Sequence, residues 1–325
     1  MAFSNTYNVT NPGSGVSNRE DLTDVLTILA PEETPILSLA NKSKATATFN
    51  EWTVDVLATP SSTGIQEGAD ISTYTDKFAG RARLGNYIQL FRRDFMVSQL
   101  QQAVESVGPA RIAEAESKAV REIKRDMEKT ICGDQDRSVE DGASARYVTR
   151  GLGNWLASAG PADVPSNFRT PAASINSSGT TLTENVFNGL IASIFTQTGT
   201  VDALSLVAGT TLRRTVSGFA RADGNTTENV YHVNQMATDK EVTLSVNTYD
   251  SDFGLITVIN GNPACLPDSS RGYIINPNYI GVAELMSLGS TRVPDQGGGQ
   301  RGFVDAAMAL QVFSPLAHGK ITAVS

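Results

Sequence analysis

Two stretches of alternating apolar and polar residues flank a long polar segment in the first third of the chain. Residues 46–57 and 83–97 show the period of two that is typical of a β-strand. About 25 residues separate them, whereas a hairpin loop usually has two to five. We therefore expect a projecting two-stranded ribbon rather than a buried hairpin. Arg92, Arg93 and Asp94 interrupt the second stretch, and a strand confined to its own core rarely carries three charges.

The clearest helical pattern covers residues 109–132. Pro109 is favoured at a helix start, and Gly133 is a common residue just beyond a helix end. The remaining positions are largely charged, so we expect the helix to lie on a surface and to contribute one side to a core. Its apolar stripe consists of Ile112, Ala115, Ala119, Ile123, Met127 and Ile131.

The N-terminal region is polar up to about residue 18 and then carries one short helical pattern. Pro31 ends that pattern, and Pro35 breaks the apolar run that follows. We expect a strap with a single short helix. The apolar side chains that it offers are Leu22, Leu26, Leu29, Ile36 and Leu37.

The second half of the chain mixes helical and strand patterns. Residues 183–199 and 210–220 have helical spacing, and the apolar run at 201–209 is typical of a buried strand. Further short strands and turns follow, and the last residues alternate again. Helices and strands mixed in this way predict an α+β fold.

Composition and charge narrow the function classes. Only 18% of residues are charged, below the roughly 25% of an ordinary globular domain, which favours a subunit with much of its surface covered in an assembly. The formal net charge is -8, and no Lys or Arg run exceeds a pair. We therefore expect no sequence-independent binding to DNA, because phosphate binding requires a basic surface.

The side chains that usually carry chemistry are scarce and badly spaced. The chain has two histidines, His232 and His318, and two cysteines, Cys132 and Cys265, without the spacing of a metal site. We predict no catalytic, cofactor or metal site. The start of the chain does not resemble a signal peptide, and no run approaches about 18 apolar residues, so we expect a soluble protein made in a reducing cytosol.

Taken in order, several stretches resemble the major capsid proteins of tailed bacteriophages, which have the Hong Kong 97-like fold. The order of arm, ribbon and helix is more specific than any single motif. "RGLGNWL" (150–156) is similar to a stretch that recurs after the helix in one group of these proteins. The other matching stretches are 30–57, 85–104, 110–134, 183–290 and 309–324.

The resemblance implies a division of the chain into four parts. These are an N-terminal arm (1–45), an extended β-hairpin loop (46–97), a peripheral domain (98–182 and 291–325) that contains the spine helix 109–132, and an axial domain (183–290). It also implies that the arm is disordered in a free subunit and ordered in a shell.

The resemblance also implies a function and partners. Copies of the chain would assemble as hexamers and pentamers into an icosahedral head in the bacterial cytoplasm, with double-stranded DNA inside that is not specifically bound. A portal protein, a separate scaffold and decoration proteins are the expected further partners, and no membrane is involved. The expected inter-subunit contacts are Trp52, Lys77, Arg92, Arg93, Asp94, Leu22, Leu26 and Leu29.

Three other interpretations remain open from the sequence. An encapsulin shell has the same fold but encloses an enzyme. A β-rich hydrolase could use an acidic pair such as Asp250 and Asp252. A tail or decoration protein should lack the long spine helix.

Overall fold

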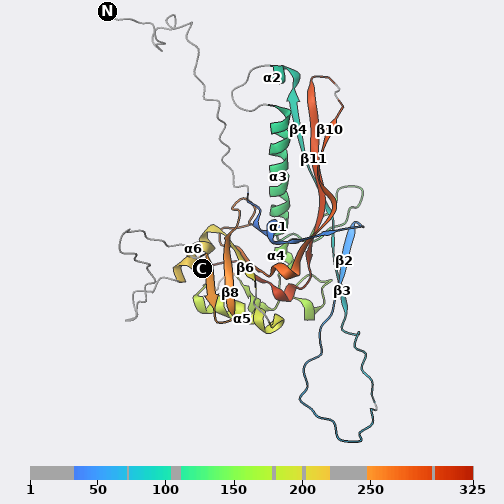
Figure 1. Ribbon diagram of the computed structural model, residues 1–325, viewed down its shortest axis with the longest axis vertical. Coiled ribbons are helices and arrows are strands. Elements are labelled where there is room, and N and C mark those ends of the chain that lie inside the picture. The colour runs from blue at the N-terminus through green and yellow to red at the C-terminus, as the bar shows by residue number, and fades with distance from the viewer. Residues whose placement is uncertain are drawn as a thin grey trace, which may run out of the picture.

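A computed structural model describes residues 33–71, 73–103, 111–177, 181–199, 203–219, 247–294 and 297–324. The described chain forms two sheets, placed side by side, and a separate two-stranded ribbon (Figure 1). The first sheet has the strand order β1 (Asn41–Lys44), β10 (Ile280–Val293), β11 (Gly299–Val312) and β4 (Gln89–Ser98). The second has the order β5 (Ile175–Asn176), β12 (Gly319–Ile321), β9 (Gly272–Ile275), β6 (Leu204–Ala208), β8 (Gly254–Asn260) and β7 (Thr248–Ser251).

The predicted spine helix is α3 (Ile112–Cys132), which lies along the four-stranded sheet (Figure 1). Its apolar stripe packs on the sheet, and Ile123 and Ile131 are completely buried against residues such as Phe91 of β4. The helix begins at Ile112 with Arg111 as its N-cap residue, and the predicted start, Pro109, lies outside the described residues. Gly133 does follow the helix end, with an extended rather than a left-handed backbone.

The six-stranded sheet is covered by α5 (Glu184–Thr198) and α6 (Thr210–Phe219), as their periodicity predicts. The Thr183 hydroxyl accepts a hydrogen bond from the Val186 amide, which caps the start of α5. Gly199 ends the helix with φ 70°, a left-handed conformation that favours glycine. Every residue of β6 is buried, so the apolar run is the buried strand expected.

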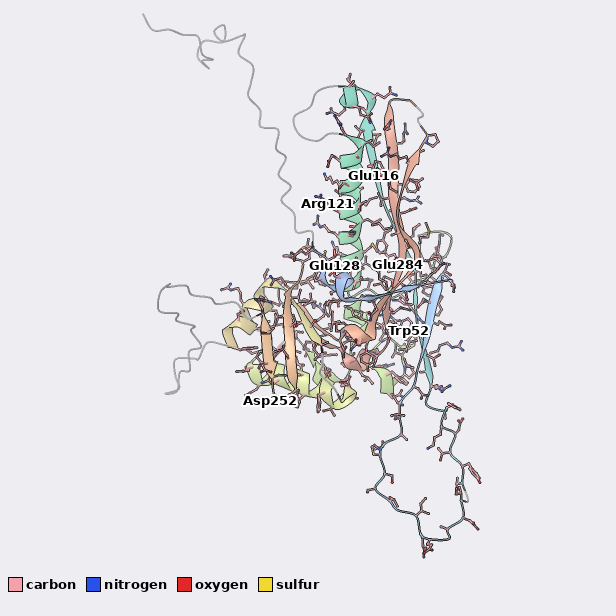
Figure 2. All side chains as sticks on the ribbon, in the orientation of Figure 1. Trp52, Glu116, Arg121, Glu128, Asp252 and Glu284 are labelled. Carbon is pink, nitrogen blue, oxygen red and sulfur yellow. The ribbon has the colours of Figure 1, made fainter. Side chains whose placement is uncertain are left out.

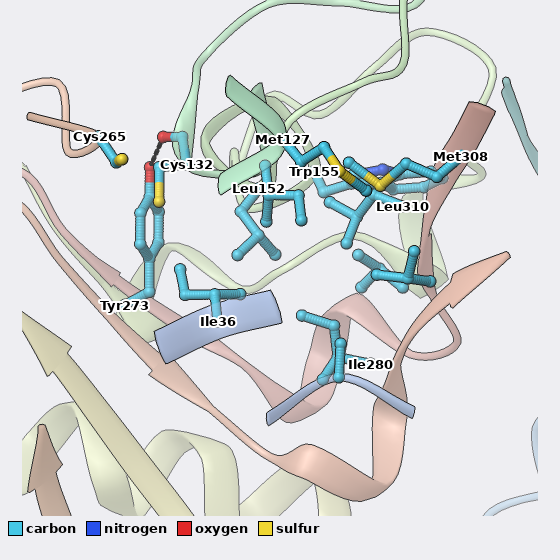
Figure 3. Close-up of a cluster of buried hydrophobic side chains, with 14 of the residues drawn as sticks. Ile36, Met127, Cys132, Leu152, Trp155, Cys265, Tyr273, Ile280, Met308 and Leu310 are labelled. Atoms are coloured by element: carbon cyan, nitrogen blue, oxygen red, sulfur yellow. Dashed lines mark hydrogen bonds between the residues drawn. The ribbon is translucent and has the colours of Figure 1, made fainter. Parts of the chain in front are cut away.

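A buried cluster joins the two sheets (Figure 3). The Tyr273 hydroxyl, from β9 of the six-stranded sheet, donates a 2.6 Å hydrogen bond to the Cys132 carbonyl at the end of α3. Leu152 and Trp155 come from the short helix α4 (Leu152–Trp155) and complete this core. Other helical elements are α2 (Gln99–Ala103) and short 3-10 turns at Ser166–Phe168, Ala172–Ser174, Pro277–Tyr279 and Pro315–Ala317.

The projecting ribbon is shorter than the alternating pattern suggests. Only β2 (Phe49–Val54) and β3 (Ala82–Tyr87) pair with each other, and the chain between them extends away from both sheets (Figure 1). The predicted return strand to Val97 is wrong beyond Tyr87, because β4 pairs with β11 along its whole length. Alternation identifies a strand, but it does not identify the partner strand.

Two other expected boundaries do not coincide with the sheets. β10 crosses residue 290, and β12 lies in the six-stranded sheet although it was assigned to the peripheral part of the chain. The division into peripheral and axial domains itself stays a prediction.

The beginning of the described chain is packed on its own subunit. Pro35 starts α1 (Pro35–Leu39) rather than merely breaking a run, since proline suits the first helical position. The buried Glu128 carboxylate of α3 accepts 2.9 Å hydrogen bonds from the amides of Ile36 and Leu37. Residues 33–45 therefore pack on their own subunit, whereas the sequence predicted a disordered arm there. Leu22, Leu26 and Leu29 lie outside the described residues.

Candidate assembly surfaces

The loop beyond the ribbon, residues 55–81, presents large apolar side chains to solvent. Leu57 is 98% exposed, Ile65 86% and Tyr74 85%, and Ile71 and Phe78 are also exposed. At the root of the loop Arg81 pairs with Asp55 at 2.8 Å and lies over the Phe78 ring. These apolar side chains have little to bury against within their own subunit, so the loop is a surface that another molecule can cover.

The strands below the loop are fixed to the body by aromatic contacts. The Trp52 ring lies 5.8 Å from the Trp155 ring and 6.0 Å from the Phe313 ring, measured between ring centroids. The sequence predicted that Trp52 contacts a neighbouring subunit, but its ring packs against rings of its own subunit. Its contact with a neighbour stays a prediction. The aromatic contacts make the ribbon a rigid base for the loop.

A buried arginine organises the region behind the ribbon. The Arg150 side chain is only 1% exposed, and its guanidinium bonds Asp136 and Asp163, each at 2.6 Å. It also lies over the Trp155 ring at 4.7 Å. This set of residues, Arg150 with Asp136, Asp163 and Trp155, is called the arginine node below. Burial alone would raise the pKa of Asp163, but the hydrogen bond and the charge of Arg150 lower it.

Hydrogen bonds between side chains and backbone groups join the ribbon to the region of the arginine node. The Asn86 side chain, on β3, accepts a 2.8 Å hydrogen bond from the Arg150 amide and donates to the Leu310 carbonyl. Arg137 donates to the Gly85 carbonyl at 2.6 Å. Because Asn86 is completely buried, its hydrogen bonds are shielded from water and hold the ribbon in one orientation.

Two glycines allow the chain to pack closely at the arginine node. A Cβ at Gly151 would lie 2.2 Å from the Gly133 carbonyl oxygen, and a Cβ at Gly153 would collide with the Asp134 carboxylate. The Gly153 amide donates to the Gly133 carbonyl at 3.0 Å. Close approach of the Gly133 backbone to Gly151, and of the Asp134 side chain to Gly153, thus explains both glycines of the "RGLGNWL" stretch.

The two arginines of β4 have partners in their own subunit. Arg93 forms two hydrogen bonds to Asp126 of α3, at 2.6 and 2.8 Å. Arg92 contacts Asp305 at 3.5 Å and lies over the Phe303 ring, and Asp94 is exposed. Internal pairing with α3 and β11 explains the two arginines of this strand. Contact with a neighbour stays a prediction for Arg92, Arg93 and Asp94.

Lys77 lies in the exposed loop, as expected, and it has no ion pair among the described residues. Whether it meets another subunit stays a prediction. His232 lies outside the described residues.

Groups that could carry chemistry are buried or dispersed. Burial raises the pKa of Cys265 to about 11 and raises that of Cys132, so both remain thiols. Burial lowers the pKa of His318 to about 4. Asp250 lies within β7, and Asp252 lies in the turn that leads to β8. Within the ranges that the structure describes, no three His, Cys, Asp or Glu side chains gather as metal ligands, and no helix is long and apolar enough to cross a membrane.

A family model decides the identity. The model described as SU10 major capsid protein matches residues 3–325. The chain belongs to that family. It is a major capsid protein, and its place is the capsid of the virion. The comparison with curated proteins returned no match.

Solved capsids share the fold of this capsid protein. The capsid of a native GTA particle is 12% identical with a TM-score of 0.63, and 98% of each chain is covered. That of cyanophage P-SCSP1u is 10% identical with a TM-score of 0.64, covering 95% of this chain and 93% of the other. Mycobacterium phage Adephagia gives 13% and 0.61, with 98% of each chain covered. The Hong Kong 97-like fold is confirmed.

Sequence reasoning missed two buried polar contacts that organise the subunit. One is the Glu128 carboxylate that holds α1, and the other is the arginine node. The only signal for the node was the "RGLGNWL" stretch, and the stretch alone does not say that its arginine is buried.

Proposed function

We propose that the capsid protein assembles with copies of itself, as hexamers and pentamers, into an icosahedral head around double-stranded DNA. In this proposal, loop 55–81 of each subunit lies over the neighbouring subunit. One observation supports it above all: the large apolar side chains of the loop are exposed while the ribbon beneath them is rigidly held.

The energetics favour such a contact. Full burial of one large apolar side chain is worth about 1.5–3 kcal/mol, so a loop that buries several of them gains several kcal/mol per contact. Each subunit would give one loop and receive one, which is a heterologous interface that closes into a ring. A rigid ribbon lowers the entropy that is lost on association.

The same proposal covers the other partners. A portal protein, a separate scaffold and decoration proteins would join the shell, and the net charge of -8 would keep the wall from adhering to the DNA. We also propose that the capsid protein is not an enzyme, since the described cysteines and His318 are buried away from any substrate.

The test is the triple substitution Ile65→Ser, Tyr74→Ser and Phe78→Ser. We expect subunits that remain folded but form no closed particles by negative-stain microscopy and sedimentation. The matched control, Ser62→Ala, Thr63→Ala and Thr75→Ala in the same loop, should assemble normally. Normal particles from the apolar triple variant would contradict the role of the loop. Particles that hold no nuclease-protected DNA when made during infection would contradict the enclosed DNA.

A further inference from the structure

A groove next to α3 is lined by no residue of the ribbon or of loop 55–81. It lies between α1, α3 and β8 and has a volume of about 530 Å³. We propose that this groove binds residues 20–29 of the same chain. The residues that line it are Glu33, Thr34, Pro35, Ser38, Leu39, Arg121, Lys124 and Ile259.

Three acidic residues of α3 have partners outside the groove. Glu116 pairs with Arg292 at 3.0 Å, Asp126 pairs with Arg93, and Glu128 holds the amides of α1. These carboxylates therefore face the sheet and α1. The exposed Arg121 and Lys124 line the groove together with Glu33, so two of its three charged side chains are basic, and Figure 2 shows Arg121 on α3 with Glu128 at the level of α1.

The segment 20–29, "EDLTDVLTIL", has the complementary chemistry. Glu20, Asp21 and Asp24 give it a charge opposite to that of Arg121 and Lys124. Its apolar side chains recur at helical spacing, so a helix would present them together to the apolar part of the groove. Those side chains are Leu22, Val25, Leu26 and Leu29, and the apolar lining consists of Pro35, Leu39 and Ile259.

The connection favours the same chain over a second copy. Glu33 lines the groove, so the only residues between the groove and the segment are 30–32, which span at most about 10 Å. Such a short tether gives an effective concentration in the millimolar range, about what a weak contact needs. A second copy of the segment and the phosphates of duplex DNA are the competing occupants.

Disulfide trapping in the full-length protein tests the proposal. The Leu26→Cys/Ser38→Cys variant, oxidised with diamide, should form an intramolecular disulfide, visible as a faster monomer band on a non-reducing denaturing gel. The native Cys132 and Cys265 are 1% and 4% exposed and should not interfere. The control pair, Thr6→Cys/Ser38→Cys, should react about tenfold more slowly, because residue 6 is not held at the groove.

Charge reversal adds a readout of specificity. Lys124→Glu should slow trapping of the Leu26→Cys/Ser38→Cys pair several-fold, and adding Asp21→Lys and Asp24→Lys should restore the rate. Lys118→Glu, on the same helix but outside the groove, should leave the rate unchanged.

Two outcomes would overturn the proposal. A disulfide found only between subunits would assign the groove to a second copy. A rate equal to that of the control pair would exclude residues 20–29, and Lys124-dependent retention of a short DNA duplex would then identify the occupant. Particle formation is read separately by microscopy, so failure here leaves the loop contact standing.

Discussion

The arginine node and loop 55–81 lie at opposite ends of the same ribbon and differ in almost every physical respect. At the node, the guanidinium of Arg150 has both carboxylate partners and a ring within its own subunit. In the loop, apolar side chains such as Leu57 and Ile65 are almost fully exposed. One region is complete in a single chain, and the other leaves its apolar side chains uncovered in that chain. Substitutions in the two regions should therefore separate folding from assembly.

The largest expected effect comes from removing the guanidinium of the arginine node. Arg150→Met should lower the free energy of unfolding by about 3 kcal/mol, the lower end for a broken buried ion pair, because both carboxylates reach water. Urea titration of the unassembled subunit, followed by tryptophan fluorescence, measures it. Arg146→Met, an exposed arginine of the same segment, is the control. A loss of unfolding free energy below about 1 kcal/mol in Arg150→Met would contradict a stabilising role for the arginine node, because the ion pairs would then contribute no more than a pair on the surface.

Close packing at the node gives the next effect. Gly151→Ala should cost about 2–3 kcal/mol, because its Cβ would collide with the Gly133 carbonyl and the backbone must shift. Gly189→Ala, in the exposed middle of α5 where nothing lies within 4 Å, should instead stabilise the subunit by about 0.5–1 kcal/mol. The same urea titration measures both. Equal effects in the two variants would be inconsistent with a packing role for Gly151.

The buried His318 predicts a pH dependence of folding that the loop cannot produce. Its Nδ1 accepts from the Asn276 amide and its Nε2 lies 3.3 Å from the Tyr279 carbonyl, an arrangement that needs the neutral imidazole. The pKa is lowered from 6.5 to about 4, so the unfolded chain binds the proton first and stability falls as the pH drops below 6.5. Between about pH 6.5 and 5 the loss should be about 2 kcal/mol.

The variant His318→Gln should lose most of that slope when unfolding is measured at a series of pH values. A slope equal to that of the native protein would show that other groups cause the acid sensitivity.

The smallest effect is expected for the charges of β4. Arg93→Met should lower the free energy of unfolding by at most about 1 kcal/mol, because the side chains of Arg93 and Asp126 are 45% and 34% exposed. A double-mutant cycle with Asp126→Asn isolates the pair. If Arg93→Met subunits unfold normally but fail to assemble by microscopy, the predicted contact of Arg93 with a neighbour gains support. Normal assembly would limit Arg93 to its internal pair.

Local periodicity was sufficient for the elements whose partners are near in sequence. The stripe of α3, the run of β6 and the capped α5 were all recognisable because each depends on neighbouring residues. The length of the polar segment between the two alternating stretches also predicted a projecting loop. These features needed no knowledge of long-range contacts.

Long-range pairing could not be predicted in the same way. β4 joins β11, which is about 200 residues away, so alternation gave the strand but assigned it to the wrong sheet. Burial of Arg150 and Glu128 depends on segments that meet only in the folded chain, and charged residues are rarely expected inside. Contacts between subunits are even harder to predict from the sequence, since they depend on the surfaces of two chains.

The strand orders also bear on how a growing chain becomes competent to join a capsid. β11 lies between β10 and β4, and β12 lies between β5 and β9, so each sheet has a gap until residues 299–321 have been synthesised. A polypeptide released early from the ribosome would lack an interior strand in both halves of the molecule. We expect such a product to be unstable, because the strands on either side of each gap would have unpaired edges.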